Sequence, residues 1–192
     1  NLNNKDSIKP ITNMIKQVSK PLVEKDLKRG LKPRNVRVMV VGIPNVGKSS
    51  FINKIAGKTR AKAENRPGVT RGNQWFTIDK QLELLDTPGV LWPKFEDQTV
   101  GEHLAFTGAV KDRILDTELL AMRLLEILSQ NYPEYLVNRY GELDFSLDSY
   151  DLLCMIGKKR GMVIRGGETD TERAANMLLE EYRNQKIGNI TL

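Results

Sequence analysis

The chain has 192 residues, of which 40% are hydrophobic and 28% are charged, and its net charge is +6. This length suits one large domain or two small ones. The sequence has no apolar run of 18 residues, which excludes a membrane span. The single cysteine, Cys154, excludes an internal disulfide and favours a reducing compartment, the cytoplasm. The charge is uneven, since residues 1–36 carry +6, residues 37–111 carry +4 and residues 112–192 carry −4.

The first predicted elements are a helix, a strand and a second helix. Residues 8–29 predict a helix that is broken or kinked near Pro21, followed by a linker over residues 28–34. Residues 36–41 form a short apolar run rich in valine, which is typical of a buried parallel strand. Residues 48–56 predict the second helix, with apolar side chains on its inner face.

The loop between that strand and helix, Gly42-Ile43-Pro44-Asn45-Val46-Gly47-Lys48-Ser49, fits the pattern G-x-x-x-x-G-K-S/T of a phosphate-binding loop. Its two glycines allow close backbone approach, and its amides can donate to phosphate oxygens at the start of a helix. Lys48 can reach the β- and γ-phosphates, and the Ser49 hydroxyl can bind Mg²⁺. The predicted nucleotide-binding residues of this loop are Pro44, Asn45, Val46, Gly47, Lys48, Ser49 and Ser50.

Residues 58–72 are polar, basic and rich in turn residues, which predicts a surface loop. Thr70, within Pro-Gly-Val-Thr, is the candidate for a second hydroxyl on Mg²⁺ that binds only when the γ-phosphate is present. The alternative is an ordinary loop threonine.

Two strands, residues 74–79 and 81–86, are predicted next, and the second ends in Asp86-Thr87-Pro88-Gly89. Asp86 can hold Mg²⁺ through water, and the Gly89 amide can sense the γ-phosphate. Trp75 lies on an alternating strand and is predicted to be part of the core. The predicted catalytic residues are Lys48, Thr70 and Gly89, and the predicted metal ligands are Ser49, Thr70 and Asp86.

The quoted motifs, together with Leu91-Trp92-Pro93-Lys94-Phe95 and Gly108-Ala109-Val110-Lys111-Asp112, resemble the ribosome biogenesis GTPase A (YlqF/RbgA) family of circularly permuted GTPases. The resemblance implies binding and hydrolysis of GTP to GDP, with Mg²⁺, and assembly of the large ribosomal subunit in contact with its rRNA. It also implies that Asn45 is a candidate K⁺ ligand, with simple stabilisation of a turn as the alternative. We expect that the protein binds neither DNA nor a membrane and that it is a monomer.

Guanine is usually read by N-K-x-D or T-K-x-D, and no such sequence follows Gly89. Before the phosphate loop, Asn4-Lys5-Asp6-Ser7 is the nearest approach, but Ser7 replaces the necessary carboxylate. These observations favour a permuted order and a chain that is incomplete at its N-terminus. The position after Gly89, where many GTPases carry a water-orienting glutamine, is Val90, so intrinsic hydrolysis should be slow, roughly 10⁻⁴ to 10⁻² per second.

The remaining residues predict helices over 117–130, 132–140, 150–157 and 171–184. His103, in a predicted helix after Gly89, is interpreted as a surface or packing residue, and Trp92 and Phe95 as contacts for a partner. A basic cluster in the otherwise acidic last third is the predicted rRNA contact, and it consists of Lys158, Lys159, Arg160 and Arg165.

We therefore predict an α/β P-loop GTPase domain, circularly permuted and incomplete at the N-terminus, followed by a small all-α C-terminal domain. The expected boundaries are residues 1–111, of which 1–34 are a helix and linker and 35–111 run from the phosphate loop to the second switch, and residues 112–192. Two alternatives stay open. One is a tRNA-modification or Era-like GTPase of conventional order, and the other is a non-catalytic RNA-binding scaffold.

Overall fold

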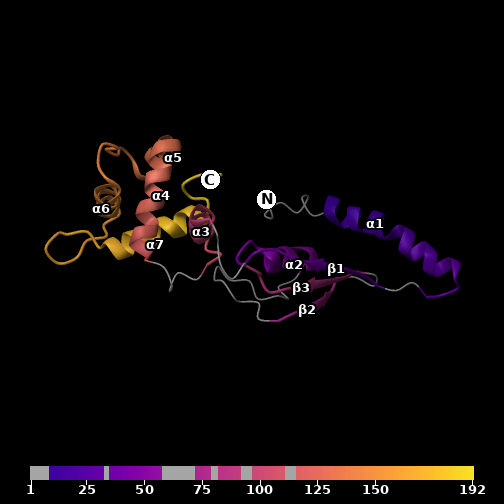
Figure 1. Cartoon of the computed structure of the whole chain (residues 1–192). Helices are drawn as coiled ribbons and strands as arrows, with labels where there is room; N and C mark the ends of the chain where they lie inside the picture. Colours follow the sequence, from indigo (N-terminus) through magenta and orange to yellow (C-terminus); the bar gives the residue numbers. More distant parts are fainter. Residues whose placement is uncertain (1–8, 33–34, 58–71, 79–81, 92–96, 111–115) are drawn as a thin grey trace. The chain divides into compact units, whose positions relative to one another are not determined.

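The computed structural model describes residues 9–32, 35–57, 72–78, 82–91, 97–110 and 116–192 (Figure 1). The chain divides into two compact units, residues 1–91 and residues 92–192. The first unit holds helices and a sheet, and the described part of the second holds helices and one isolated β-bridge, Val163 with Thr169.

The first unit contains helix α1 (Lys9–Lys28), strand β1 (Val36–Val40), helix α2 (Lys48–Ala56) and strands β2 (Gln74–Thr77) and β3 (Leu82–Asp86). The sheet order is β1-β3-β2, with β1 parallel and β2 antiparallel to β3. Each predicted strand forms, although each ends or begins a residue or two inside the predicted range. The predicted first helix forms as one continuous element with Pro21 inside it, so it is not broken at the proline.

Helix α2 covers one face of the sheet (Figure 1). Ile52 from α2 and Leu82 and Leu84 from β3 are buried together, and Ile15 of α1 packs against the same cluster. Successive side chains of a strand point to opposite faces, so Val36, Val38 and Val40 also face α2. The alternation in the sequence therefore places an apolar layer under the helix that follows the loop.

The opposite face of the sheet carries Trp75, and here the sequence-based prediction of a core residue was wrong. Trp75 pairs with Leu85 on the face away from α2 and is 50% exposed. The guanidinium of Arg37 lies over its ring, 5.0 Å from the centroid. Alternation alone identifies two faces, and it does not say which of them the fold covers.

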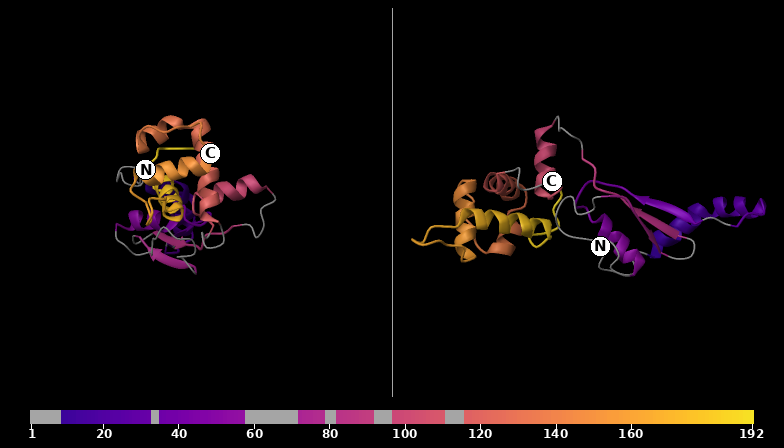
Figure 2. Two further views of the ribbon diagram at one scale, coloured as in Figure 1. Left: turned by 90° about the vertical axis from the view of Figure 1, so that its left-hand side faces the viewer. Right: turned by 90° about the horizontal axis from the view of Figure 1, so that it is seen from below.

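The second unit contains helices α3 (Gln98–Phe106), α4 (Thr117–Asn131), α5 (Pro133–Tyr140), α6 (Ser149–Lys159) and α7 (Thr171–Arg183). Aspartate side chains accept a hydrogen bond from the first turn of four of these helices, and a proline begins α5, which explains where the helices start. Helix α4 packs on α6 and α7, and α6 packs on α7 (Figure 2). All five helices contribute to one core, whose fully buried members include Phe106, Leu124, Leu128, Leu136, Leu153, Ile156 and Leu178.

The division between the units differs from the predicted boundary after residue 111. It falls between Leu91 and Trp92, because α3 belongs to the helical core. Phe106 of α3 is completely buried there, and α3 contacts both α4 and α7. The helix that follows Asp86-Thr87-Pro88-Gly89 is therefore built into the second unit and not into the first.

Within the described ranges, no helix combines the length and the apolar character that crossing a bilayer requires.

Candidate nucleotide-binding site

Two loops leave the sheet at the same edge, and they carry the predicted site. In the parallel register of β1 and β3, Val40 lies opposite Asp86. The phosphate loop follows β1, and the segment from Thr87 to Gly89 follows β3. Ligands of parallel sheets bind beyond the carboxyl ends of the strands, so this edge is where a nucleotide is expected.

The phosphate loop has the backbone that its sequence predicts. Gly47, immediately before α2, has φ of 89°, and Asn45 has φ of 59°. Both values lie in the left-handed region, which asparagine tolerates better than most residues. Within the part of the chain that the structure describes, the amides of Asn45, Gly47 and Lys48 donate to no carbonyl, so they can serve an anion at the start of α2.

Lys48 folds back over its own loop. Its Nζ donates to the carbonyl oxygens of Gly42, at 3.1 Å, and Ile43, at 2.8 Å. Burial lowers the pKa of Lys48, and the carboxylate of Asp86 acts in the opposite direction. A partly desolvated ammonium at the mouth of the loop interacts more strongly with phosphate oxygens than one in water does.

Ser49 and Asp86, the two predicted metal ligands that the structure describes, meet beneath the loop. The Ser49 hydroxyl donates to Oδ2 of Asp86 at 2.7 Å, and the two residues are 9% and 2% exposed. In the described residues, no group of three or more His, Cys, Asp or Glu side chains could hold a metal. Mg²⁺ fits the Ser49–Asp86 pair nevertheless, since it is commonly bound by one or two protein oxygens together with phosphates and water.

Gly89 is packed against the phosphate loop. A Cβ at this position would stand 2.4 Å from both Cα and N of Pro44, so only glycine allows the observed approach. The next amide, of Val90, donates to the Gly42 carbonyl at 3.3 Å. The two loops are therefore in direct contact, so a displacement of one loop must displace the other.

Thr87 is a site residue that the sequence analysis did not single out. Its hydroxyl donates to the carbonyl of Val40 at 2.7 Å and so ties the end of β1 to the segment after β3. A threonine directly after the strand-end aspartate was visible in the sequence, but its partner lies 47 residues away along the chain.

Some predicted residues lie elsewhere. Thr70, Trp92 and Phe95 fall outside the described residues. Val90 is exposed, and an aliphatic side chain there cannot orient water. His103 lies in α3, with its ring centroid 6.1 Å from that of the buried Phe106, so it belongs to the helical unit.

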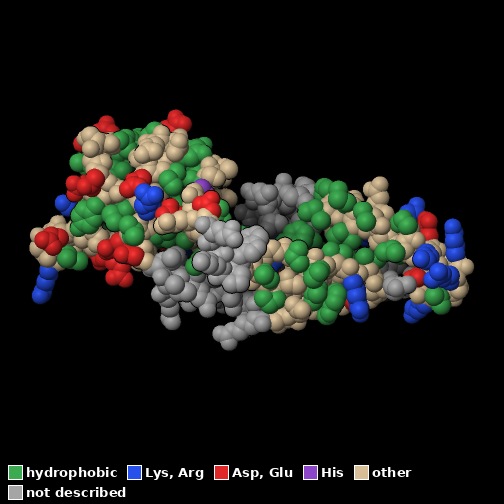
Figure 3. All heavy atoms as spheres, in the orientation of Figure 1, with side chains coloured by type: hydrophobic (Ala, Val, Ile, Leu, Met, Phe, Trp, Pro, Cys, Tyr) green, Lys and Arg blue, Asp and Glu red, His purple; other side chains and the backbone are tan. Residues whose placement is uncertain are grey.

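The four residues of the predicted rRNA cluster differ in whether they contact other residues of the protein. Lys159 Nζ donates to the carbonyl of Glu142, and Arg160 donates to the carbonyl of Arg139 at 3.1 Å and lies over the ring of Tyr140. Lys158 and Arg165 are exposed, and the structure shows no ion pair for either among the residues it describes. In the view of Figure 3, acidic side chains gather over the helical unit and basic ones over α1.

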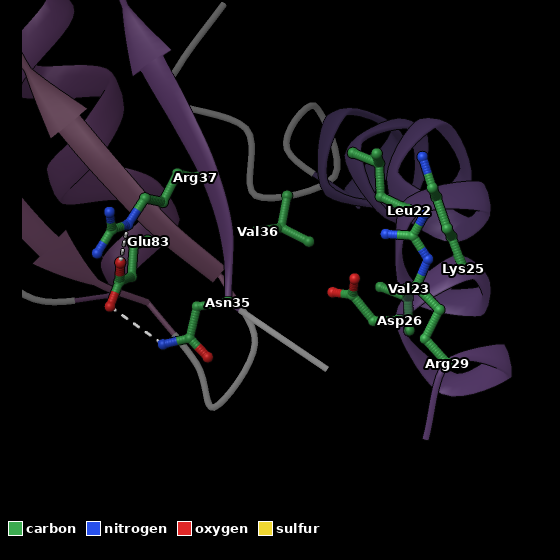
Figure 4. Close-up of a pocket in the computed structure, with 9 residues that line it drawn as sticks. All are labelled: Leu22, Val23, Lys25, Asp26, Arg29, Asn35, Val36, Arg37 and Glu83. Atoms are coloured by element: carbon green, nitrogen blue, oxygen red, sulfur yellow. Dashed lines mark hydrogen bonds and ion pairs between the residues drawn. The ribbon is translucent and has the colours of Figure 1, made fainter. Parts of the chain in front are cut away.

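A hollow of approximately 700 Å³ lies between α1 and the starts of β1 and β3 (Figure 4). It is lined by Val36 and Arg37 at the beginning of β1, whereas the phosphate loop follows the end of that strand. Hydrogen bonds from Asn35 and Arg37 lower the pKa of Glu83 in its wall. Because it lies at the amino ends of the parallel strands, this hollow is not the phosphate site.

The fold and the loop define a P-loop nucleoside-triphosphate-binding domain. A family model described as "50S ribosome-binding GTPase" matches residues 37–138. The chain belongs to this family.

The relatives confirm the resemblance drawn from the sequence. Ribosome biogenesis GTPase A of Bacillus cereus is 45% identical over 184 residues, which are 96% of this chain and 62% of the relative. Its counterpart in Priestia megaterium is 50% identical over 160 residues, 83% of this chain and 56% of the relative. The chain thus spans about 60% of the length of these proteins.

Solved structures agree. A GDP-bound YlqF is 25% identical with a TM-score of 0.55, and the match covers 92% of this chain and 76% of that one. A GNP-bound YlqF from Thermotoga maritima is 27% identical with a TM-score of 0.51, covering 85% and 60%.

Proposed function

We propose that this chain is the switch-bearing part of a GTP-hydrolysing assembly factor for the large ribosomal subunit. The observation that carries the proposal is the buried hydrogen bond between Ser49 and Asp86, directly beneath a phosphate loop. The two oxygens that a magnesium–nucleotide complex needs are brought together from two elements far apart in sequence. The family and the names of the relatives supply the guanine nucleotide and the ribosome.

In the proposed site each residue has one task. Lys48 binds the β- and γ-phosphates, and the amides of the loop from Pro44 to Ser50 surround the phosphate oxygens. Ser49, Asp86 and Thr70 hold Mg²⁺, which when bound neutralises phosphate charge. Asn45 is proposed as the ligand of a K⁺ ion.

Gly89 is proposed as the sensor of the γ-phosphate. Its amide lies on the segment that contacts Pro44, so a phosphate that shifts the loop also shifts this segment. Val90 offers no group to orient water, so turnover by the protein alone is slow and the ribosomal particle stimulates it.

The order of motifs supports circular permutation. Neither N-K-x-D nor T-K-x-D occurs after Asp86, although a conventional GTPase needs one there. We propose that the guanine-reading residues precede the phosphate loop in the chain order of the complete protein. This order speaks against an Era-like GTPase.

The helical unit is proposed to contact rRNA through the end of α6 and the turn after it. Lys158 and Arg165 are the exposed cations of this region, next to the half-exposed Val163 and Ile164. Lys159 and Arg160 are also exposed, and their side chains donate to the backbone carbonyls of Glu142 and Arg139. The protein is proposed to act as a cytoplasmic monomer.

The test is GTP turnover by the full-length protein, in K⁺ and in Na⁺, with and without large ribosomal subunits. We expect slow turnover by the protein alone, faster turnover with the subunit, and a further increase of the turnover rate in K⁺.

Lys48→Ala should abolish nucleotide binding. The double variant Lys158→Ala with Arg165→Ala should reduce only the stimulation by the subunit, and Lys159→Ala is the matched control. Normal nucleotide binding and normal cycling on ribosomal subunits by Lys48→Ala would contradict the proposal.

A further inference from the structure

The segment between α6 and α7 forms a short hairpin that extends beyond the helices of its unit (Figure 1, Figure 2). Val163 and Thr169 form a β-bridge on its two arms. The amide of Gly167 donates to the carbonyl of Ile164 at 3.2 Å, which closes a four-residue turn at the tip. Gly166, at the third position of this turn, has φ of 101°, in the left-handed region that favours glycine. The hairpin therefore ends in a tight turn of defined shape.

The base of this hairpin is fixed to the helices on both sides. The Thr169 hydroxyl donates to the carbonyl of Cys154 in α6 at 3.1 Å, and a Cβ at Gly157 would stand 2.5 Å from Cγ2 of Thr169. The amide of Asp170 donates to the carbonyl of Met162 at 2.9 Å, and the Asp170 carboxylate caps α7. The Met162 side chain packs against the core of the unit. The tip is thus carried on a firmly attached base.

Two apolar side chains are exposed directly beyond that base. Val163 is 50% exposed and Ile164 is 49% exposed. Arg165 follows them at the second position of the turn and is exposed as well. Adjacent apolar side chains held in water on a projecting element are typical of an interaction surface.

The charges beside this apolar pair favour RNA as the partner. Residues 158–165 carry four Lys or Arg and no Asp or Glu, although residues 112–192 together have a net charge of −4. Lys158 and Arg165 lie on either side of the pair in the sequence, and both are exposed. Such cations bind backbone phosphates and release counterions. Apolar side chains gain nothing from a phosphate, so the pair must meet another part of the RNA.

The apolar surfaces of RNA are the faces of its bases, and these are accessible only where bases are unstacked. In a regular duplex the major groove is too deep and narrow for side chains, and the minor groove displays 2′-hydroxyls. A loop or bulge instead presents splayed bases next to phosphates. It therefore offers both of the chemistries that the hairpin carries.

We propose that the hairpin over residues 162–169 docks on an unpaired loop or bulge of rRNA. Val163 and Ile164 contact base faces there, and Lys158 and Arg165 contact the flanking phosphates. The inference rests on the proposed function, because it names the RNA structure that the surface at the end of α6 recognises. The cations contribute affinity that falls with salt, whereas the apolar pair contributes affinity that salt does not screen.

The experiment measures the affinity of the full-length protein for large ribosomal subunits, with a non-hydrolysable GTP analogue, at several salt concentrations. Val163→Thr with Ile164→Thr keeps the β-branched side chains that suit a hairpin and removes the apolar contact. We expect the affinity to fall about tenfold at every salt concentration, without a change of melting temperature. Leu119→Gln, at an exposed apolar position on α4, is the matched control and should keep wild-type affinity.

Arg165→Ala should behave differently from the threonine variant. It removes one phosphate contact, so the slope of log affinity against log salt concentration should become shallower by about 0.7 to 0.9. The slope of the threonine variant should equal that of wild type. A shallower slope in the threonine variant would show that the apolar pair only positions the cations, and that result would overturn the inference.

A photoreactive amino acid in place of Ile164 identifies what the tip contacts on the subunit. We expect crosslinks to unpaired nucleotides of rRNA. Crosslinks to a ribosomal protein or to duplex nucleotides, no crosslink at all, or unchanged affinity in the threonine variant would each overturn the inference and leave the proposed function standing. Failure of wild type to bind nucleotide or subunit would instead refute the proposed function itself, and the inference with it.

Discussion

At the scale of single residues, the site depends on how closely two loops approach. Gly89 lies against the backbone of Pro44, Val90 donates to Gly42, and Thr87 donates to Val40. These contacts join the segment after β3 to the phosphate loop at several points. The phosphate loop and the segment after β3 are therefore packed together as one unit.

Gly89→Ala tests this contact. The new Cβ would stand 2.4 Å from backbone atoms of Pro44, so the phosphate loop must move by a substantial part of an ångström. We expect nucleotide affinity to fall about tenfold, which corresponds to ~1.4 kcal/mol, with the fold retained. Titration with a fluorescent GDP analogue measures this.

Gly72→Ala is the control, because a Cβ at Gly72 would meet nothing within 4 Å. Wild-type affinity in Gly89→Ala would show that the two loops are not as tightly joined as their packing indicates.

At the scale of elements, one buried carboxylate joins three helices of the second unit. Glu181 of α7 accepts from Arg139 of α5 at 2.9 Å and, also at 2.9 Å, from the hydroxyl of Tyr140, and Arg160 after α6 lies 4.0 Å away. The hydrogen bond from Arg139 is the main reason that the pKa of Glu181 is lowered. Burial is the main reason that the pKa of Tyr140 is raised.

Glu181→Gln should therefore destabilise the helical unit by about 2 kcal/mol at neutral pH, since the partly exposed Arg139 loses the charged partner of its hydrogen bond. The pKa of Glu181 is lower in the folded than in the unfolded protein. The ionised carboxylate thus stabilises the fold above the unfolded pKa, and this contribution is lost as pH falls through the folded value.

The difference between wild type and Glu181→Gln should accordingly shrink as the pH is lowered below about 4.5. Urea unfolding at several pH values gives the measurement, with the surface substitution Glu172→Gln as control. A difference that is the same at neutral and acid pH would show that the charge of Glu181 is not what stabilises the network.

At the scale of the whole molecule, the division of the chain places α3 with the helices that follow it. A boundary after residue 111 would cut Phe106 and Ala105 out of the core they complete.

Two fragments of the chain test whether the second unit begins before α3 or after residue 111. Residues 97–192 should fold as an isolated domain, whereas residues 112–192 should be less stable by about 3–5 kcal/mol, the usual effect of removing a buried phenylalanine. Thermal unfolding followed by circular dichroism compares them, and Phe106→Ala in the longer fragment should reproduce most of the loss. Equal stability of the two fragments would place α3 outside the core.

The sequence alone determined the phosphate loop, the strands around it, the aspartate beneath it and nearly all helix limits. These features depend on local signals: a glycine pattern, alternation along a strand, and aspartates that cap helices. The tertiary structure alone decided the rest. It put α3 in the helical unit and Trp75 on the open face of the sheet, and it gave Lys159 and Arg160 hydrogen bonds to backbone carbonyls of the same unit. Each of these depends on partners many positions away, and a local pattern cannot specify which of several apolar faces or cations the folded chain will engage.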